Sequence, residues 1–237
     1  MKILSIDTSS KVATVAILDD DVLVGEYILN NKREHSVILI LMIEELLKES
    51  NLSIDEIDGY VVSKGPGSFT GLRIGLATIK GMSFGSNKPY VSISSLDALA
   101  YSLLSFNGII CPIMDALRDN VYTSLYVNNN GVLENILDIT SMEIQDLVSL
   151  LNEKKTNVIF TGDAVYKHKE YIKENMDNAF FAQNHLNIVR ASSLGELGMS
   201  LLKSGIKDDP NSAPVYLKKP QAERELERRL KLDESNS

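Results

Sequence analysis

Residues 1–29, MKILSIDTSSKVATVAILDDDVLVGEYIL, contain three runs rich in aliphatic and β-branched side chains. We expect strands over residues 2–6, 12–18 and 22–29, since such runs bounded by Asp, Ser and Gly are typical of strands. Asp19, Asp20 and Asp21 form a short polar connection that favours a hairpin. The chain therefore begins with three strands, and the elements that follow them decide the fold class.

Helices and single strands alternate after this opening, and a similar order returns in the second half. In the first half we expect a helix over 35–49, a strand over 59–62, a helix over 70–85, a strand over 90–93 and a helix from Ser95. In the second half we expect strands over 109–114, 121–127, 132–139 and 158–161, and helices from Ser141 and near Val165 and Ser193. Two β-β-β-α-β-α units predict an α/β protein of two domains, each a mixed sheet with flanking helices. We expect domains over 1–103 and 104–220, and a charged tail over 221–237 that is a frayed helix or disordered.

Composition narrows the class of protein. The 237 residues are 44% hydrophobic, which is enough to bury a substantial core, and 24 basic against 32 acidic residues give a net charge of -8. A protein that holds nucleic acid alone usually has a basic face, because contacts with phosphate supply much of the affinity. The longest apolar run, Val37 to Ile43, is too short to span a membrane, and no signal segment precedes the first strand. We therefore expect a cytoplasmic protein that makes no membrane contact.

The sequence offers few residues for catalysis or for binding a metal. Cys111 is the one cysteine, and the three histidines are far apart without a second ligand at metal-binding spacing. No Ser/His/Asp or Cys/His set can be assembled by spacing. Asp7 and Asp115 each end a predicted strand. A phosphate or nucleotide loop could be formed by Asp7 with Thr8 and Ser9. A second such loop could be formed at Gly162, later in the chain. The alternative is that these residues simply begin turns.

The stretch SKGPGSFTGLRIG, residues 63–75, is the most distinctive in the chain. It lacks the Gly-Lys-Ser/Thr of a Walker A motif, and Pro66 interrupts a Rossmann fingerprint. A ligand loop and a plain strand-to-helix turn both remain open. The helix after it places Gly71, Gly75, Thr78 and Met82 on one face, although each interior glycine costs about 1 kcal/mol relative to alanine.

A face with such small residues lets another helix approach closely, either within this chain or from a partner. The helix over 35–49 is apolar around nearly its whole circumference, more than a helix covering one side of a sheet requires. We therefore predict a partner interface on these two helices, with packing inside the chain as the alternative. Its residues are His35, Leu39, Met42, Ile43, Leu46, Gly71, Gly75, Thr78 and Met82.

Several of these motifs together resemble the TsaB family. They are Ile6-Asp7-Thr8-Ser9, Arg33-Glu34-His35-Ser36, the loop from Gly65 to Gly75, Asp115-Ala116-Leu117-Arg118 and Pro214-Val215-Tyr216-Leu217. The resemblance covers about residues 1–220. The glycine loop is the most specific part, and its motif residues are Gly65, Pro66, Gly67, Ser68, Phe69, Thr70 and Arg73.

The resemblance implies an actin/Hsp70-like fold and a role in making N6-threonylcarbamoyladenosine on tRNA. TsaB is the non-catalytic paralogue of TsaD, which works with the ATPase TsaE and modifies adenosine-37 of tRNAs that read ANN codons. By resemblance, this chain is a scaffold or activator without catalysis of its own. It pairs with a TsaD-like subunit, meets a TsaE-like ATPase, forms a homodimer when alone, and reaches tRNA only through the complex.

The chain departs from the catalytic pattern at three places. Residues 93–99 contain no histidine where TsaD has its metal-binding His-x-x-x-His, Thr8 and Ser9 follow Asp7 where glycine is usual, and Leu117 stands where arginine is common. We therefore expect no intrinsic cofactor and no metal, and treat Asp7, Thr8, Ser9, Asp115 and Gly162 as degenerate nucleotide loops. ATP or ADP at the complex interface stays open. The alternatives are a weak ATPase, a glycopeptidase-like hydrolase, or a self-associating interaction protein.

Overall fold

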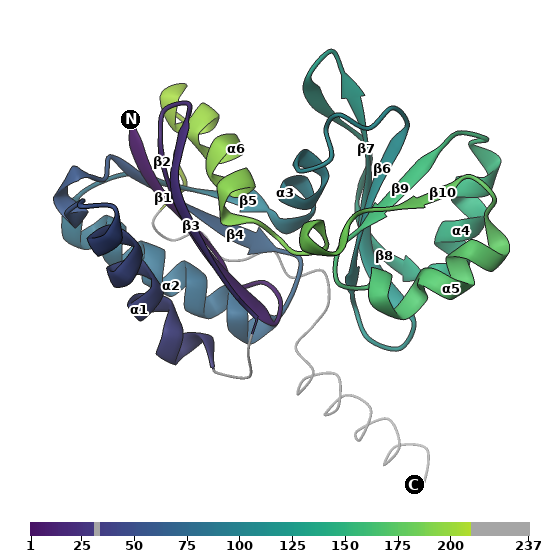
Figure 1. Ribbon diagram of the computed structural model, residues 1–237, viewed down its shortest axis with the longest axis horizontal. Helices are drawn as coiled ribbons and strands as arrows, with labels where there is room; N and C mark the ends of the chain where they lie inside the picture. The colour runs from purple at the N-terminus through teal and green to yellow at the C-terminus, as the bar shows by residue number, and fades with distance from the viewer. Residues whose placement is uncertain (31–33, 210–237) are drawn as a thin grey trace, which may run out of the picture.

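Two mixed five-stranded sheets form the framework of the protein, and helices cover them (Figure 1). The computed structural model describes residues 1–30 and 34–209. The first sheet, in the order β3-β2-β1-β4-β5, contains β1 (Lys2–Asp7), β2 (Val12–Asp19), β3 (Val22–Asn30), β4 (Gly59–Gly65) and β5 (Tyr90–Ser94). The second, in the order β10-β9-β6-β7-β8, contains β6 (Ile109–Asp115), β7 (Asn120–Asn129), β8 (Val132–Glu143), β9 (Val158–Thr161) and β10 (Ala179–Phe181). The two-sheet α/β prediction is confirmed.

The two sheets have the same topology. In each, the first strand pairs antiparallel with the next strand and parallel with the strand that follows a helix. The helices in the described part of the chain are α1 (His35–Glu49), α2 (Phe69–Ser86), α3 (Ser95–Tyr101), α4 (Ile144–Glu153), α5 (Val165–Asn175) and α6 (Ala191–Lys203), with short 3-10 turns at Ile54–Glu56 and Asn184–Leu186. No helix among residues 1–30 and 34–209 is long and apolar enough to cross a membrane.

Three hydrophobic clusters hold the layers together. One joins α1 and α2 to a face of the first sheet, and another joins α4 and α5 to the second sheet. The third lies between the sheets and includes Ile3 and Val61 of the first sheet, Leu99 and Leu194 on α3 and α6, and Ile110 of the second sheet. Apolar contacts therefore run continuously from one sheet to the other.

Helix α6 follows the second sheet in sequence but packs on the first (Figure 1). Gly198 allows this close packing, because a Cβ there would lie 2.5 Å from Val61 Cγ2. The predicted boundary at residue 103/104 stays a prediction, yet the later half of the chain does not all pack on its own sheet. The reason is that the apolar face of α6 meets the strand residues Ile3, Leu18 and Val61.

Two smaller differences concern the second sheet. The helix expected from Ser141 begins only at Ile144, because pairing of β8 with β7 continues to Asn120↔Glu143. Strand β10 was not expected at all; its three residues add a parallel edge next to β9. The expected tail over 221–237 lies outside the described residues, as do Arg33 and Pro214 to Leu217.

Candidate functional site

The glycine loop and the Thr8–Ser9 loop meet because their strands are parallel neighbours. β1 and β4 pair with Ile6 opposite Val62, so the segments after Asp7 and after Gly65 leave the same edge of the sheet. The Ser68 backbone N–H donates to the Ser9 carbonyl at 2.6 Å. A Cβ at Gly67 would overlap that same carbonyl oxygen. The glycine at 67 therefore lets one loop close directly onto the other.

The small-residue face of α2 continues this contact. Thr8 Oγ1 donates to the Gly71 carbonyl at 2.8 Å, and a Cβ at Gly71 would overlap the Thr8 carbonyl oxygen. A Cβ at Gly75 would lie 2.5 Å from Thr8 Oγ1. Gly71 and Gly75 therefore face the first sheet and its loop. The close approach that they permit is to Thr8 of the same chain, which favours the alternative of packing inside the chain; their part in a partner interface stays a prediction.

The first turn of α2 presents the remaining loop residues. Ser68 caps the helix by accepting from the Gly71 N–H at 3.2 Å, which satisfies one free donor of the helix start. Thr70 and Arg73 are exposed, and the Arg73 guanidinium lies 3.9 Å from the centre of the Phe69 ring. Pro66 within the glycine loop is buried.

The apolar helix α1 divides its residues between the core and the surface. Leu39, Met42, Ile43 and Leu46 are buried against the first sheet, so they are core residues of this chain. Their burial favours the alternative of packing inside the chain, and their part in a partner interface stays a prediction. Met82 on α2 is half-buried and packs against the same cluster. Thr78 is also half-buried. His35, at the start of α1, donates from Nε2 to the Ser10 carbonyl at 2.8 Å.

The outer faces of α1 and α2 carry the apolar residues that no sheet covers. On α1, Val37, Ile40 and Leu41 are 60%, 47% and 56% exposed. On α2, Phe84 is 90% exposed, and Gly81 and Ala77 are exposed one and two turns before it. We call Val37, Ile40, Leu41, Ala77 and Gly81 the outer helix face. The sequence indicated this face through the apolar circumference of α1. That pattern does not indicate which side of the helix packs against the sheet.

Three aspartates follow strand ends in positions that suit a nucleotide loop. Asp7 is fully buried; its Oδ1 accepts from the Ser9 N–H at 3.3 Å, and its Oδ2 has no hydrogen-bond partner within the described part of the chain. Burial raises the pKa of Asp7 to about 7. Asp115 and Asp163 adjoin each other, because β6 and β9 are parallel neighbours and the Asp115 N–H donates to Asp163 Oδ1 at 3.0 Å. Burial also raises the pKa of Asp163.

The first of the two expected nucleotide loops is closed. Thr8 and Ser9 are buried beneath the glycine loop, so neither side chain faces solvent. Gly162 is buried too: its N–H donates to Asn187 Oδ1 at 3.2 Å, and a Cβ there would overlap the Ile113 carbonyl oxygen. Asp115 alone of the five predicted loop residues is exposed. Among residues 1–30 and 34–209, no three His, Cys, Asp or Glu side chains are grouped to hold a metal.

Comparison with known proteins places this geometry in context. A family model described as TsaD, tRNA N6-adenosine threonylcarbamoyltransferase, matches residues 23–226. The tRNA threonylcarbamoyladenosine biosynthesis protein TsaB of Bacillus subtilis (strain 168) is 34% identical over 224 residues, covering 94% of this chain and 96% of that protein.

Two solved structures share the fold. YeaZ from Pseudomonas aeruginosa has a TM-score of 0.74 at 21% identity, covering 91% of this chain and 99% of that one. The ROK hexokinase from Thermus thermophilus has a TM-score of 0.51 at 10% identity, covering 86% and 100%. The chain therefore has the expected actin-like ATPase fold.

Proposed function

Because this chain belongs to the TsaB family of tRNA threonylcarbamoyladenosine biosynthesis proteins, we propose that it is a non-catalytic scaffold or activator subunit in that synthesis. It acts by forming a heterodimer with a TsaD-like catalytic subunit in the cytoplasm. A TsaE-like ATPase joins the complex, and tRNA binds through the complex. ATP or ADP, where it takes part, sits at the interface between subunits. The observation that carries this proposal is the outer helix face.

The outer helix face has the chemistry of a helix-to-helix interface. Full burial of one Val, Ile or Leu side chain stabilises an association by about 1.5–3 kcal/mol, and α1 holds three such side chains that are about half exposed. Ala77 and Gly81 leave α2 bare beside them, since a Cβ at Gly81 would meet nothing within 4 Å. A partner helix can therefore approach the backbone of α2 while its side chains contact Ile40 and Leu41. Large exposed apolar patches of this kind mark interaction surfaces.

The closed Thr8–Ser9 loop supports an accessory role. A phosphate would have to displace the Ser68–Ser9 hydrogen bond and lift α2 from Thr8 before reaching these hydroxyl groups. The same glycine contacts that bury the loop fix α2 rigidly on the sheet. We infer that the loop serves this chain as a support for the outer helix face.

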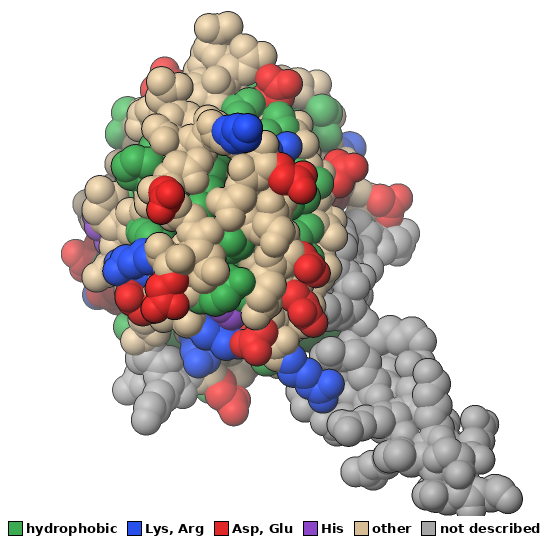
Figure 2. Space-filling model, turned by 90° about the vertical axis from the view of Figure 1, so that its right-hand side faces the viewer, with side chains coloured by type: hydrophobic (Ala, Val, Ile, Leu, Met, Phe, Trp, Pro, Cys, Tyr) green, Lys and Arg blue, Asp and Glu red, His purple; other side chains and the backbone are tan. Residues whose placement is uncertain are grey.

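The charge distribution supports recruitment of tRNA through the partner. The net charge is -8, and Figure 2 shows acidic side chains scattered over the face formed by the second half, with fewer basic ones among them. Such a surface repels a polyanion at long range. The catalytic subunit would therefore supply most contacts with phosphate.

The test combines assembly with activity. The chain and a TsaD-like subunit are mixed and followed by analytical ultracentrifugation, and threonylcarbamoyladenosine is measured on tRNA after adding a TsaE-like ATPase and the threonylcarbamoyl donor. Leu41→Asp should leave the isolated chain folded, with an unchanged circular dichroism spectrum, while abolishing both heterodimer and product. Val132→Asp, which places the same charge on an exposed residue of the second half, should change neither.

Two results would contradict the proposal. Product formation by the catalytic subunit without this chain would remove the activator role. Normal assembly of Leu41→Asp would show that the outer helix face is not the interface. The isolated chain is expected to form a homodimer through the same face, so Leu41→Asp should also be monomeric when alone.

A further inference from the structure

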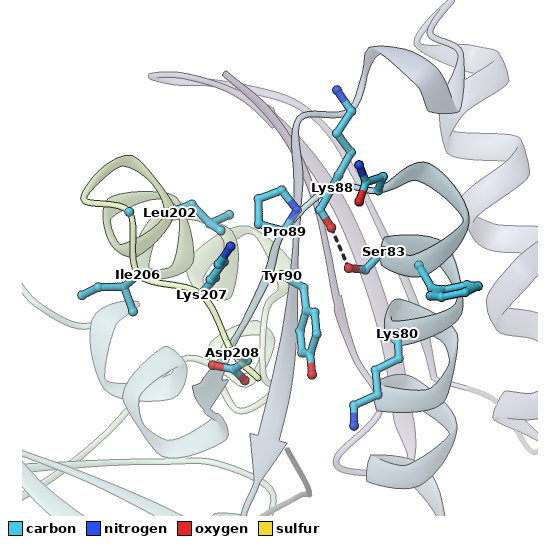
Figure 3. Close-up of a pocket in the computed structure, with 12 residues that line it drawn as sticks. Lys80, Ser83, Lys88, Pro89, Tyr90, Leu202, Ile206, Lys207 and Asp208 are labelled. Atoms are coloured by element: carbon cyan, nitrogen blue, oxygen red, sulfur yellow. Dashed lines mark hydrogen bonds between the residues drawn. The ribbon is translucent and has the colours of Figure 1, made fainter. Parts of the chain in front are cut away.

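A groove of about 750 Å³ opens between the end of α2, the start of β5 and the segment after α6 (Figure 3). We call it the α2–β5 groove. Tyr90 forms its floor and is itself held in place, since its hydroxyl donates to the Asp209 carbonyl at 2.9 Å. The Asp208 N–H donates to the Tyr90 carbonyl at 2.9 Å, so the segment after α6 is tied to the sheet edge. The groove thus has fixed walls.

The ionisable side chains that line the groove are mainly basic. They are Lys80 on α2, Lys88 in the turn before β5, and Lys207 after α6. Figure 3 places Lys80 and Lys207 on opposite sides of Tyr90. Among the described residues that line the groove, Asp208 is the one carboxylate, and it accepts a hydrogen bond from Ser92 Oγ at 2.5 Å. On a chain of net charge -8, the ammonium groups of Lys88 and Lys207 beside one groove form a local site for an anion.

Apolar surface lies beside these charges. Phe84 at the groove edge is 90% exposed, and Ile206 on the opposite wall is 53% exposed. An aromatic ring open on its face, flanked by lysines, is the arrangement on which single-stranded nucleic acid stacks its bases while its phosphates meet the cations. An acidic peptide would satisfy the lysines but makes no particular use of the ring.

We propose that the α2–β5 groove binds a single-stranded segment of the RNA substrate, with phosphates at Lys88 and Lys207 and one unstacked base on Phe84. This inference rests on the proposed function, which brings an RNA to the complex. Phe84 lies one turn after Gly81 of the outer helix face, at the edge of the groove, and is left free for RNA. An RNA held by a partner on that face can therefore reach the groove without leaving the complex.

The experiment measures RNA affinity as a function of salt in the assembled complex. The complex of the full chain with the TsaD-like subunit is titrated with an unmodified tRNA transcript between about 50 and 200 mM salt. The groove variant is Lys88→Gln/Lys207→Gln. The matched control is Lys154→Gln/Lys155→Gln, which removes the same charge from an exposed turn after α4.

The groove variant should lower the slope of log affinity against log salt by about 1.4, since each phosphate contact with a single strand contributes about 0.7. The control should leave the slope unchanged. Phe84→Leu keeps an apolar side chain but removes the aromatic face, and it should weaken binding by about fivefold or more. Ultracentrifugation of each variant with the partner shows whether the complex still forms.

Four outcomes would overturn the proposal, and they are distinguishable. Equal slopes for the groove and control variants mean that no RNA phosphate binds there. Lost assembly without a change in slope means that the groove receives a protein partner. A lower melting temperature of the isolated groove variant, with unchanged RNA binding, means that the chain itself fills the groove. If the unaltered chain does not assemble with the catalytic subunit, the proposed function is wrong. The proposal that the groove binds RNA, which rests on that function, is then rejected as well.

Discussion

At the scale of single residues, Thr8 determines how closely helix α2 packs on the first sheet. Its hydroxyl donates to the Gly71 carbonyl, and its backbone lies where a side chain at residue 71 would be. Two glycines in the interior of α2 weaken the isolated helix by about 1 kcal/mol each. The helix tolerates them because they allow contact with Thr8, and the hydrogen bond and buried surface offset the loss.

Gly75→Leu should therefore destabilise the isolated chain. The new side chain meets Thr8 Oγ1 and Val62 Cγ2, and overpacking of this kind typically costs 1–3 kcal/mol. Urea unfolding measures the loss. Gly81→Ala is the control on the same helix, where a Cβ meets nothing and better helix propensity should raise stability by up to about 1 kcal/mol. Equal stability of Gly75→Leu and the unaltered chain would contradict the inward orientation of this face.

Asp7 gives the protein a pH-dependent stability. Its carboxyl has a folded pKa of about 7 because burial disfavours the charged form, against 3.8 as the ordinary value. The folded chain therefore holds a proton that the unfolded chain loses above about pH 4. The unfolding free energy attributable to Asp7 falls as pH rises from about 4 to 7 and is constant above that range.

Asp7→Asn should remove this dependence. The difference between the two pKa values is about three units, which at about 1.4 kcal/mol each sets an upper limit near 4 kcal/mol. We expect the variant to gain stability relative to the unaltered chain when both are measured by denaturant unfolding at pH 5 and pH 8, with the larger gain at pH 8. A gain that is the same at both pH values would show that Asp7 does not titrate in this range.

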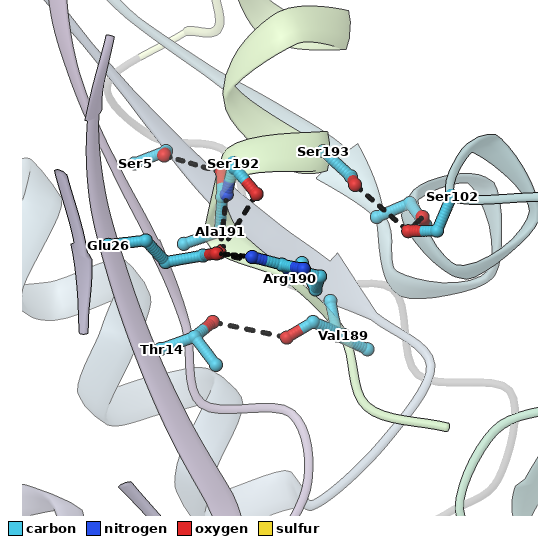
Figure 4. Close-up of polar contacts among 10 residues, drawn as sticks. Ser5, Thr14, Glu26, Ser102, Val189, Arg190, Ala191, Ser192 and Ser193 are labelled. Carbon is cyan, nitrogen blue, oxygen red and sulfur yellow. Dashed lines mark hydrogen bonds and ion pairs between the residues drawn. The ribbon is translucent and has the colours of Figure 1, made fainter. Parts of the chain in front are cut away.

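At the scale of elements, helix α6 depends on a residue far away in sequence for its start. Its N-cap residue, Arg190, makes no side-chain cap, and Glu26 on β3 takes over that role (Figure 4). Glu26 Oε1 accepts from the Ser192 N–H at 3.0 Å, and Oε2 accepts from Arg190 Nε at 3.0 Å. Ser5 Oγ also donates to the Ala191 carbonyl at 2.6 Å. These bonds hold the returning chain on the first sheet.

Glu26→Gln should lower the unfolding free energy by about 2 kcal/mol, because it removes a nearly buried charge from the start of a helix and from Arg190. Thermal and denaturant unfolding both report the change. Glu170→Gln breaks the exposed pair with Lys173 and should alter stability by less than about 1 kcal/mol. An effect at Glu26 as small as that at Glu170 would mean that the hydrophobic contacts of α6 are enough to keep the start of the helix on the first sheet.

At the scale of the whole molecule, the acidic net charge and the basic groove have separate consequences. Long-range attraction to RNA depends on the summed charge, which is negative, whereas the groove acts only on a strand already brought close. The outer helix face lies next to the groove along α2, so a partner can provide that proximity. The two surfaces therefore act in sequence.

The isolated chain should accordingly bind tRNA weakly. In a fluorescence anisotropy titration near physiological salt, we expect no saturation below about 10 μM, within the range of non-specific binding. The TsaD-like subunit tested alone is the comparison, and the complex should bind more tightly than either component. Tight, salt-sensitive binding of tRNA by this chain alone would contradict the interpretation that its negative net charge leaves tRNA binding to the partner.

The order of elements and the α/β class follow from the sequence alone, because strand and helix periodicities are local. The helix over 35–49 was predicted with the bounds that α1 has, and the repeated order of strands gave the two sheets. The short strand β10 was not predicted, because three residues are too few to show a strand periodicity. They become a strand only by pairing with β9. The nucleotide-loop residues were found as candidates, but their sequence did not reveal that a second loop would cover them.

Tertiary structure alone decided which side of each helix faces out. Helix α1 is apolar on both sides, so periodicity could not choose between Leu39 and Ile40; contact with the sheet buries the first and leaves the second exposed. The glycines of α2 suited either a partner or the chain itself until the parallel pairing of β1 and β4 brought Thr8 beneath them. Glu26 and Arg190 are separated by 164 residues and meet only because α6 returns to the first sheet. Sequence patterns specify local conformation, whereas burial is set by which surfaces the folded chain brings together.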